Sequence, residues 1–243
     1  MSSSDVDREL KRLTRRGFIT AAVAAGAGYA SWKWLRTRSR ADGLAWPLRS
    51  ALQANESLAE AYFSRARLSP SFRPSDVTRA RLNGRLGLQS PIDLDAWRLT
   101  IAGAAEPLAL TMDDIRALPR HDQITELRCI EGWSIIVKWT GVRLADLVQR
   151  YPPTELPKYI AIETPDRGYY VGLDIESALH PQTLLAYEMN GSPLALLHGA
   201  PLRLAIPVKY GIKNIKRIGT IRYTNIRPAD FWAERGYDWY AGH

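Results

Sequence analysis

One segment of the chain places a cysteine thiol beside an arginine at a predicted turn, a combination that can bind a soft metal ion. Cys129 is the only cysteine among 243 residues, and it lies in residues 127–134 (LRCIEGWS), where a predicted strand runs into a glycine-containing turn. A lone cysteine is most often a small buried hydrophobic residue. A thiolate next to Arg128, however, can bind a soft or borderline metal ion. The single cysteine excludes an intramolecular disulfide and a zinc site of several thiolates.

A second segment is rich in cations that alternate with glycine. Residues 198–204 (HGAPLRL) are followed by residues 207–216 (PVKYGIKNIK). In such a stretch, charged side chains and bare backbone amides can converge on an anion such as a phosphate. The same stretch would also suit a solvated basic strand edge. The sequence contains no Gly-x-Gly-x-x-Gly, no Gly-x-x-x-x-Gly-Lys and no Gly-x-Ser-x-Gly, so the common nucleotide and hydrolase motifs are absent.

The elements that must position these two segments are short. Apolar residues at helical spacing predict a helix early in residues 41–75, and Pro70 and Pro74 then interrupt regular structure. Asn190-Gly191 predicts a hairpin turn. Helices are predicted at 111–118 and 142–149, and strands at 96–102, 108–110, 124–129, 134–139, 159–163, 169–173, 184–189, 193–197, 202–206 and 217–223. Short strands and helices without regular alternation predict an α+β fold.

The N-terminal region has the features of an export signal. Residues 1–40 carry nine Lys/Arg and three acids, which is +6 of the net charge of +8. Arg15 and Arg16 precede Phe18-Ile19 and an uncharged run over residues 17–32, a pattern typical of twin-arginine signals. We therefore predict a signal or membrane anchor over 1–40, a helix and loop over 41–75, and a catalytic domain over 76–243. The remaining charge of +2 argues against nucleic-acid binding.

Taken together, the motifs resemble a known family. Arg-Cys-x-Glu-Gly-Trp-Ser, the turn at residues 186–191 (AYEMNG), His-Gly-Ala-Pro-Leu-Arg and Lys-Tyr-Gly-Ile-Lys-Asn-Ile-Lys are similar to the molybdopterin-binding domain of the sulfite oxidase superfamily, from about Phe63 to Tyr240. The cysteine motif is closest to bacterial exported members such as the methionine-sulfoxide reductases. The resemblance implies short mixed β-sheets with short peripheral helices, and a molybdenum–molybdopterin cofactor.

The resemblance also implies roles for individual residues. Cys129 would be the thiolate ligand of molybdenum. Arg65, within Phe63–Arg67, would line the substrate pocket, although Ala66 stands where the family has asparagine. Tyr237 would lie near the metal. The residues implied to contact the cofactor are Thr164, His198, Arg203, Asn214, Ile215 and Lys216.

The implied reaction is two-electron oxygen-atom transfer, and its direction stays open at this point. Trp133 stands where sulfite oxidases have a cationic turn, which favours reduction of an S-oxide. Arg65 and Tyr237 would instead suit sulfite-type oxidation of a small oxoanion. A non-catalytic module that has lost the metal is a third possibility.

The implied partners follow from the need for an external redox protein and from the predicted export signal. The sequence has no Cys-x-x-Cys-His for haem attachment. A cytochrome or a haem-bearing membrane subunit is therefore the expected redox partner. The twin-arginine machinery would deliver the protein to the periplasm, either released or anchored to the inner membrane.

Overall fold

The computed structural model describes residues 3–41, 43–106 and 108–243, and the chain divides into two compact units, Met1–Ala51 and Leu52–His243. The first unit contains α1 (Ser3–Arg36) and a short pair of strands, β1 (Arg40–Ala41) and β2 (Leu44–Ala45). This division differs from the predicted boundaries at residues 40 and 75, and the first two residues of the predicted signal lie outside the described part. Within that part, no helix combines the length and the apolar character that a membrane span needs.

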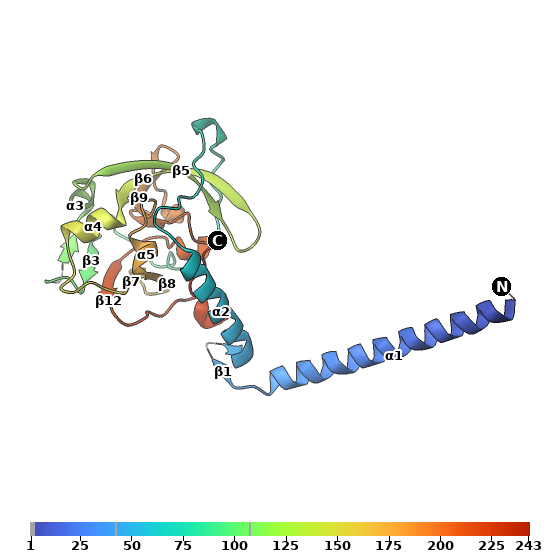
Figure 1. Cartoon of the computed structure of the whole chain (residues 1–243). Helices are drawn as coiled ribbons and strands as arrows, with labels where there is room; N and C mark the ends of the chain where they lie inside the picture. Colours follow the sequence, from blue (N-terminus) through green and yellow to red (C-terminus); the bar gives the residue numbers. More distant parts are fainter. Residues whose placement is uncertain (1–2, 42, 107) are drawn as a thin grey trace. The chain divides into compact units, whose positions relative to one another are not determined.

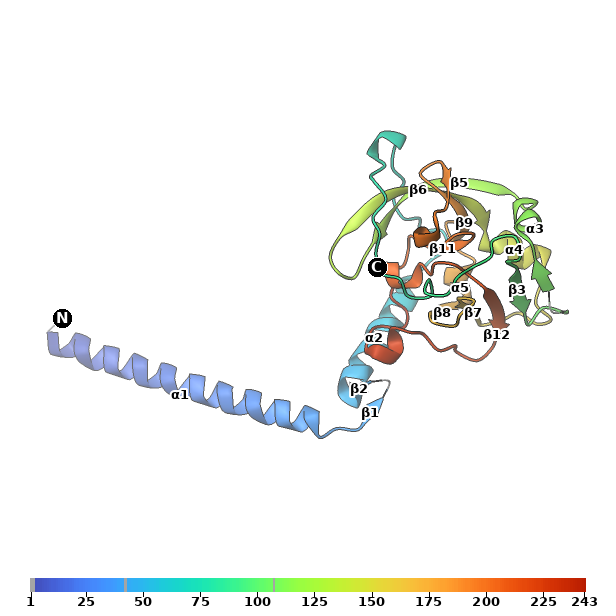
Figure 2. The same cartoon turned by 180° about the vertical axis from the view of Figure 1, so that it is seen from behind.

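Helix α2 (Trp46–Tyr62) leads into the second unit, in which most strands belong to two sheets (Figures 1 and 2). One sheet has the order β4-β3-β12-β7-β8 and is mixed, because β12 runs parallel to β3 and antiparallel to β7. Its strands are β3 (Leu99–Ala102), β4 (Leu108–Leu110), β7 (Tyr159–Glu163), β8 (Tyr170–Asp174) and β12 (Thr220–Thr224).

The other sheet is antiparallel and contains a long hairpin. Its order is β10-β9-β6-β5, and a short strand, β11, also pairs with β9. Its strands are β5 (Arg120–Arg128), β6 (Ser134–Arg143), β9 (Leu184–Met189), β10 (Ser192–Pro193) and β11 (Arg203–Ala205).

Short helices connect these strands, so the α+β prediction is confirmed. The α-helices of this part are α3 (Met112–Arg116), α4 (Leu144–Arg150) and α5 (Ile175–Ala178). Single 3₁₀ turns are η1 (Pro74–Asp76), η2 (Leu196–His198), η3 (Gly211–Lys213) and η4 (Ala233–Arg235).

Several predicted element boundaries differ from the observed ones for a common reason. The helix expected from residue 142 begins at Leu144, because Val142 and Arg143 still pair with β9 in the ladder. The strand expected at 193–197 ends at Pro193 and gives way to η2. The hairpin at Asn190-Gly191 is confirmed, and both turn residues have a positive φ, 54° and 80°. Tertiary contacts thus moved the ends of elements, and residues 196–197, predicted as strand, belong to the 3₁₀ turn η2 instead.

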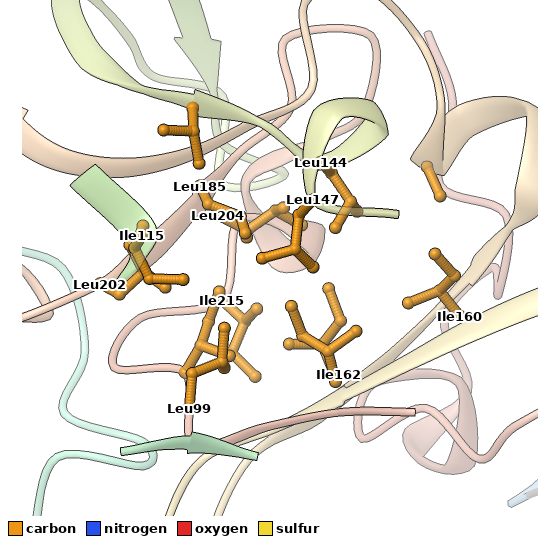
Figure 3. Packing of buried hydrophobic residues seen from close by; sticks show 14 of the residues in the cluster. Leu99, Ile115, Leu144, Leu147, Ile160, Ile162, Leu185, Leu202, Leu204 and Ile215 are labelled. Carbon is orange, nitrogen blue, oxygen red and sulfur yellow. The ribbon is translucent and has the colours of Figure 1, made fainter. Parts of the chain in front are cut away.

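The main hydrophobic core lies where the two sheets and α4 meet (Figure 3). Leu99, Ile162 and Ile160 come from the mixed sheet, and Leu185 and Leu204 come from the antiparallel one. The adjacent residues Leu184 and Ala186 point to the opposite face of β9 and join a second cluster with Trp139. Apolar clusters therefore cover both faces of β9.

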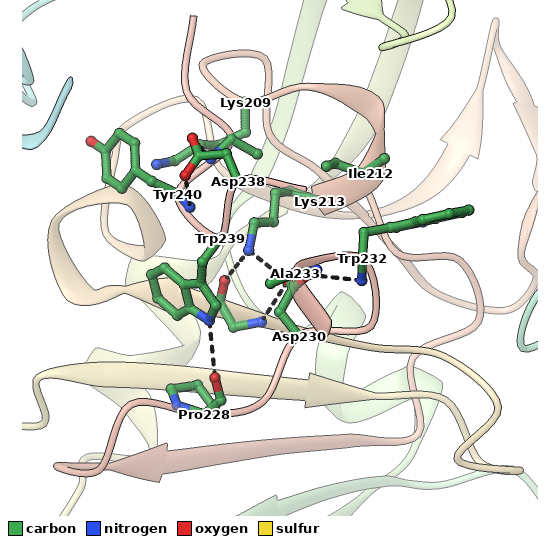
Figure 4. A network of polar contacts seen from close by, with 12 residues as sticks. Lys209, Ile212, Lys213, Pro228, Asp230, Trp232, Ala233, Asp238, Trp239 and Tyr240 are labelled. Atoms are coloured by element: carbon green, nitrogen blue, oxygen red, sulfur yellow. Dashed lines mark hydrogen bonds and ion pairs between the residues drawn. The ribbon is translucent and has the colours of Figure 1, made fainter. Parts of the chain in front are cut away.

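A buried ion pair fixes the C-terminal segment onto the mixed sheet (Figure 4). Lys213 Nζ donates to Asp230 Oδ2 at 2.6 Å and to the carbonyl of Gly172 in β8 at 2.8 Å. Asp230 Oδ1 accepts the backbone N–H groups of Trp232 and Ala233, both at 3.1 Å. Burial lowers the pKa of Lys213, whereas Asp230 acts in the opposite direction. The backbone N–H of Gly172 also donates to Asp230 Oδ2 at 3.3 Å, so one carboxylate satisfies four donors in a nearly dry environment.

We expect Asp230→Asn to lower the free energy of unfolding by about 3–5 kcal/mol, because Lys213 would be left buried without its carboxylate partner. Glu163→Gln is the matched control, since Glu163 pairs with Arg222 at 3.7 Å on the exposed side of β12. That variant should cost less than about 1 kcal/mol. Urea unfolding of both variants measures the difference, and equal destabilisation would contradict a special role for the buried pair.

Candidate functional site

The turn between β5 and β6 holds Cys129 in a fixed position. The backbone N–H of Cys129 donates to the carbonyl of Trp133 at 2.9 Å, and the N–H of Gly132 donates back to the carbonyl of Cys129 at 3.1 Å. Gly132 adopts a φ of 88°, which favours glycine. The alternation of β5 places Leu127 and Cys129 on one face, where both line a cavity.

This cavity has a volume of about 390 Å³, which is within the range of small-ligand sites. It draws its walls from segments far apart in the sequence: the 81–86 segment, the β5–β6 turn, Tyr169, η3 and the C-terminal segment. Its lining residues are Arg81, Asn83, Gly84, Leu86, Leu127, Cys129, Ile130, Glu131, Trp133, Tyr169, Met189, Arg203, Gly211, Ile212, Asn214, Lys216, Trp232 and Tyr237.

The thiol of Cys129 is buried at this cavity and has one side-chain amide beside it. The Nδ2 of Asn83 lies 3.6 Å from Cys129 Sγ. Burial raises the pKa of the thiol, whereas the backbone N–H groups of Glu131 and Ile130 lower it; the charge of Glu131 raises it and that of Arg81 lowers it. No group of three or more His, Cys, Asp or Glu that could hold a metal occurs among the described residues. A metal at Cys129 would therefore need most of its ligands from a cofactor.

Arg203 is a buried cation whose partners are all neutral. Its Nη atoms donate to the carbonyls of His198 at 3.0 Å and Asn214 at 3.2 Å, and the guanidinium lies over the ring of Trp139. Its Nε is buried without a partner in the described structure. Burial lowers the pKa of Arg203 to about 10. A buried guanidinium without a carboxylate is costly unless an anion binds to it.

Lys216 is a second cation that lines the cavity, and it connects the wall that contains Arg203 to residues 83–84. Its Nζ donates to the carbonyls of Asn83 and Gly84, the latter at 3.2 Å. Burial, reinforced by Arg203, lowers the pKa of Lys216 to about 8. Arg203 and Lys216 line the same cavity without a carboxylate partner in the described structure, which indicates a place for an anion.

Aromatic side chains form much of the remaining wall. Trp133 donates from Nε1 to Glu131 Oε2 at 2.9 Å, and the Arg81 guanidinium lies 4.6 Å from the centre of its ring. Trp232 and Tyr237 meet edge to face at 5.2 Å. The hydroxyl of Tyr169 donates to the carbonyl of Ile212. Burial raises the pKa of this hydroxyl above its ordinary value. Tyr237, whose relative exposure is 41%, reaches solvent.

The structure brings together five of the residues named from the sequence. Cys129, Arg203, Asn214, Lys216 and Tyr237 all line the same cavity. The order of the motifs along the chain does not predict that these residues lie close together, because their positions depend on how the strands of both sheets pair.

The other four named residues lie elsewhere. Ile215 is a core residue. His198 is outside the lining, but Arg203 and Lys216 contribute to its lowered pKa after burial, and its Nδ1 is buried without a described partner. Thr164 bonds to Asp166 and to Tyr169, beside Gly87. Arg65 does not line the cavity, because both its Nε and Nη2 are held by Glu176 at 2.6 and 2.7 Å.

An arginine and an asparagine that were not named from the sequence also line the cavity. Arg81 and Asn83 line the cavity, and both were overlooked in the sequence. The signal was present: Ala66 lacks the asparagine of the family segment, whereas residues 81–83 (RLN) supply an arginine and an asparagine. This segment has no helical or strand periodicity, so only the two residue types could have indicated it.

A second cavity of about 280 Å³ lies on the other face of β5. Glu126 and Arg128, which alternate with the cavity-lining Leu127 and Cys129, belong to its wall. Tyr240 is among its aromatic residues. The two cavities are thus separated by the thickness of one strand.

Comparison with known proteins agrees with this geometry. The family described as oxidoreductase molybdopterin binding domain matches residues 87–232. The chain is 35% identical over 184 residues to YedZ1 of Azospira oryzae, covering 74% of this chain and 70% of that protein. It is 38% identical over 157 residues to the protein-methionine-sulfoxide reductase catalytic subunit MsrP of Xanthomonas campestris, which covers 58% of this chain and 49% of MsrP.

A solved structure shares the fold. The crystal structure of the sulfane dehydrogenase SoxCD from Paracoccus pantotrophus superposes with a TM-score of 0.53 at 18% identity, covering 68% of this chain and 50% of that one. The chain therefore spans only about half the length of MsrP and of the SoxCD chain.

The cavity leads to a prediction about cofactor retention. Arg203→Met and Lys216→Met should each weaken binding of a pterin phosphate about 10- to 100-fold, because each removes one charge-assisted contact worth about 1.5–3 kcal/mol. Pterin content per chain at limiting cofactor measures the effect. Arg222→Met, an exposed arginine of β12, is the control and should keep full content. Full pterin content in both cavity variants would show that the cations do not bind the cofactor.

Proposed function

The chain belongs to the oxidoreductase molybdopterin binding domain family, and we propose on this basis that it is an exported enzyme that reduces sulfoxides. The observation that carries the proposal is one cavity with a buried thiol at one place and two cations without carboxylate partners at another. The name of the Xanthomonas relative, a protein-methionine-sulfoxide reductase catalytic subunit, supports methionine sulfoxide in proteins as the substrate.

The residues of the cavity fit the cofactor of the family. Cys129 would give a thiolate to the molybdenum, a soft donor that suits this metal. Arg203 and Lys216 would hold the phosphate of the pterin, which satisfies the buried guanidinium. When bound, the cofactor supplies two-electron oxygen-atom transfer, and the protein supplies binding, orientation and charge.

The walls of the cavity suit a neutral sulfur compound. Trp133, Trp232 and Tyr237 offer aromatic edges and faces against which a thioether or a sulfoxide can pack. Reduction of a sulfoxide consumes two electrons and two protons and yields a thioether and water. Tyr237 lines the cavity and is partly exposed, and we propose that its hydroxyl passes protons between solvent and the cavity. Arg65 lies outside this lining and pairs with Glu176, so the proposal assigns it no part in binding the substrate.

Sulfite-type oxidation is the second candidate, and one observation favours it. Arg81 lines the cavity and has no carboxylate within ion-pair distance in the described structure. It could hold the charge of a small oxoanion as Arg65 was expected to do. The assay below separates the two directions.

The proposal includes export and an external electron donor. Arg15 and Arg16 lie in α1, followed by the exposed side chains of Phe18 and Ile19, and this supports recognition of the segment as a twin-arginine signal. Transport would place the enzyme in the periplasm. A cytochrome or a haem-bearing membrane subunit is proposed as the donor, because the chain has no haem-attachment motif.

The test of the reaction uses molybdenum-loaded protein. We expect reduced viologen to drive the conversion of methionine sulfoxide to methionine, and we expect no reduction of ferricyanide with sulfite. Cys129→Ser should abolish turnover while the protein still unfolds at the same urea concentration, because an alkoxide replaces a thiolate poorly. Sulfite oxidation without sulfoxide reduction would assign the second candidate. A purified protein without molybdenum or pterin would favour a non-catalytic module.

Export has its own prediction. Replacing both Arg15 and Arg16 with lysine keeps the charge but removes the paired guanidinium groups. We expect the double variant to accumulate in the cytoplasm, as measured by cell fractionation. Arg36→Lys and Arg38→Lys, made together at the other end of the first unit, serve as the control. Normal periplasmic accumulation of the Arg15/Arg16 variant would contradict a twin-arginine route.

A further inference from the structure

The positive charge of the second unit is concentrated in one segment. Residues 63–90 contain six arginines and a single acid, Asp76. Residues 91–243, by contrast, contain 17 Lys/Arg and 18 Asp/Glu. The excess charge therefore belongs to the part of the chain that crosses from α2 to the mouth of the cavity. We call residues 78–88 the arginine segment, because they carry three arginines and no acid.

The arginine segment is held at both ends. At its start, Thr78 exchanges hydrogen bonds with Ile136 of β6, and Asn190 donates to the Thr78 carbonyl at 3.0 Å. Further along, Lys216 binds the carbonyls of Asn83 and Gly84. At its end, Leu86 packs on the main core and Gly87 is buried. The arginines between these points are therefore displayed on a fixed backbone.

The three arginines of the segment are exposed, and the residues on both sides of Arg85, Gly84 and Leu86, line the cavity. Arg79, Arg81 and Arg85 are exposed, and Arg81 lines the cavity directly. In the described structure, none of the three lies within ion-pair distance of a carboxylate. The acid that lines the same cavity, Glu131, accepts a hydrogen bond from Trp133. The segment that contributes Arg81, Asn83, Gly84 and Leu86 to the cavity thus carries three exposed arginines without a carboxylate partner in the described structure.

We propose that the arginine segment binds acidic residues that flank the sulfoxide in a polypeptide substrate, so that the enzyme prefers methionine sulfoxides with Asp or Glu neighbours. This inference rests on the proposed sulfoxide-reductase function and names its substrate class.

The geometry of an extended chain gives the reason. A methionine sulfoxide side chain must enter the cavity from the mouth, so the residues on either side of it lie across the rim. In an extended peptide, neighbouring residues are about 3.3 Å apart, and those two to four positions away reach beyond the rim. Carboxylates at those positions meet Arg79 and Arg85, which speeds association and excludes basic sequences.

The experiment compares two peptides on the molybdenum-loaded full chain with reduced viologen as donor. Both contain one central methionine sulfoxide, flanked by glutamates in one peptide and by lysines in the other. At low salt we expect kcat/KM for the acidic peptide to exceed that for the basic one by about tenfold or more, and the ratio to fall as NaCl screens the charges. Dimethyl sulfoxide, which has no flanking charge, reports the reaction itself.

Variants assign the preference to the segment. Arg79→Gln and Arg85→Gln should each reduce the ratio by about two- to fivefold, the value of one exposed ion pair, and leave dimethyl sulfoxide turnover unchanged. Arg222→Gln, exposed on β12, should change neither value.

Equal kcat/KM for the two peptides, or an acidic preference that survives Arg79→Gln together with Arg85→Gln, would overturn the inference while the proposed function stands. Salt-sensitive retention on anionic lipid vesicles without any peptide preference would also overturn it, in favour of a membrane surface. Absence of turnover with every sulfoxide, dimethyl sulfoxide included, would contradict the proposed function itself.

Discussion

The ion pair between Lys213 and Asp230 is the contact on which the cavity walls depend. Lys213 also binds the carbonyl of Gly172 in β8, and Asp230 holds the N–H groups that begin the Trp232 turn. Three segments are thereby joined at one point: η3, which carries Ile212, the strand that follows Tyr169, and the turn that carries Trp232. Each of these segments contributes a wall to the cavity. Geometry that must be held within an ångström is thus built on a rigid, solvent-free contact.

The charged groups of the second unit serve two different purposes. Where a cation must fix the fold, a carboxylate is buried with it, as at Lys213. Where a cation lies at the cavity, the carboxylate is missing, as at Arg203, and backbone carbonyls orient the side chain instead. We infer from this difference that cations such as Arg203 are completed by a bound anion, because burying a charge without a counterion destabilises the protein.

Much of the fold follows from the sequence, but the site follows only in part. The Asn190-Gly191 turn, the short strands and the position of Cys129 after β5 rest on local chemistry, which a sequence displays. Arg81 and Asn83 escape such reasoning because they lie in an irregular segment whose shape is set by Thr78, Leu86 and Lys216, all of them contacts made after folding. Arg65 is the converse case, since a suitable residue type in a plausible segment is bound by a distant carboxylate, Glu176, that the sequence does not place beside it.

Lys216 has two roles in this site. It lines the cavity together with Arg203, and its ammonium group donates hydrogen bonds to the carbonyls of Asn83 and Gly84. A ligand that attracts this ammonium group away from the carbonyls of Asn83 and Gly84 breaks their hydrogen bonds and makes residues 83–84 more mobile. A polypeptide that binds to residues 83–84 and stabilises them keeps the ammonium group in its place. Thermodynamic reciprocity requires that the two effects be equal in free energy. The affinity for the cofactor should therefore depend on the substrate present, so that the fraction of enzyme that holds the cofactor differs between working and resting enzyme.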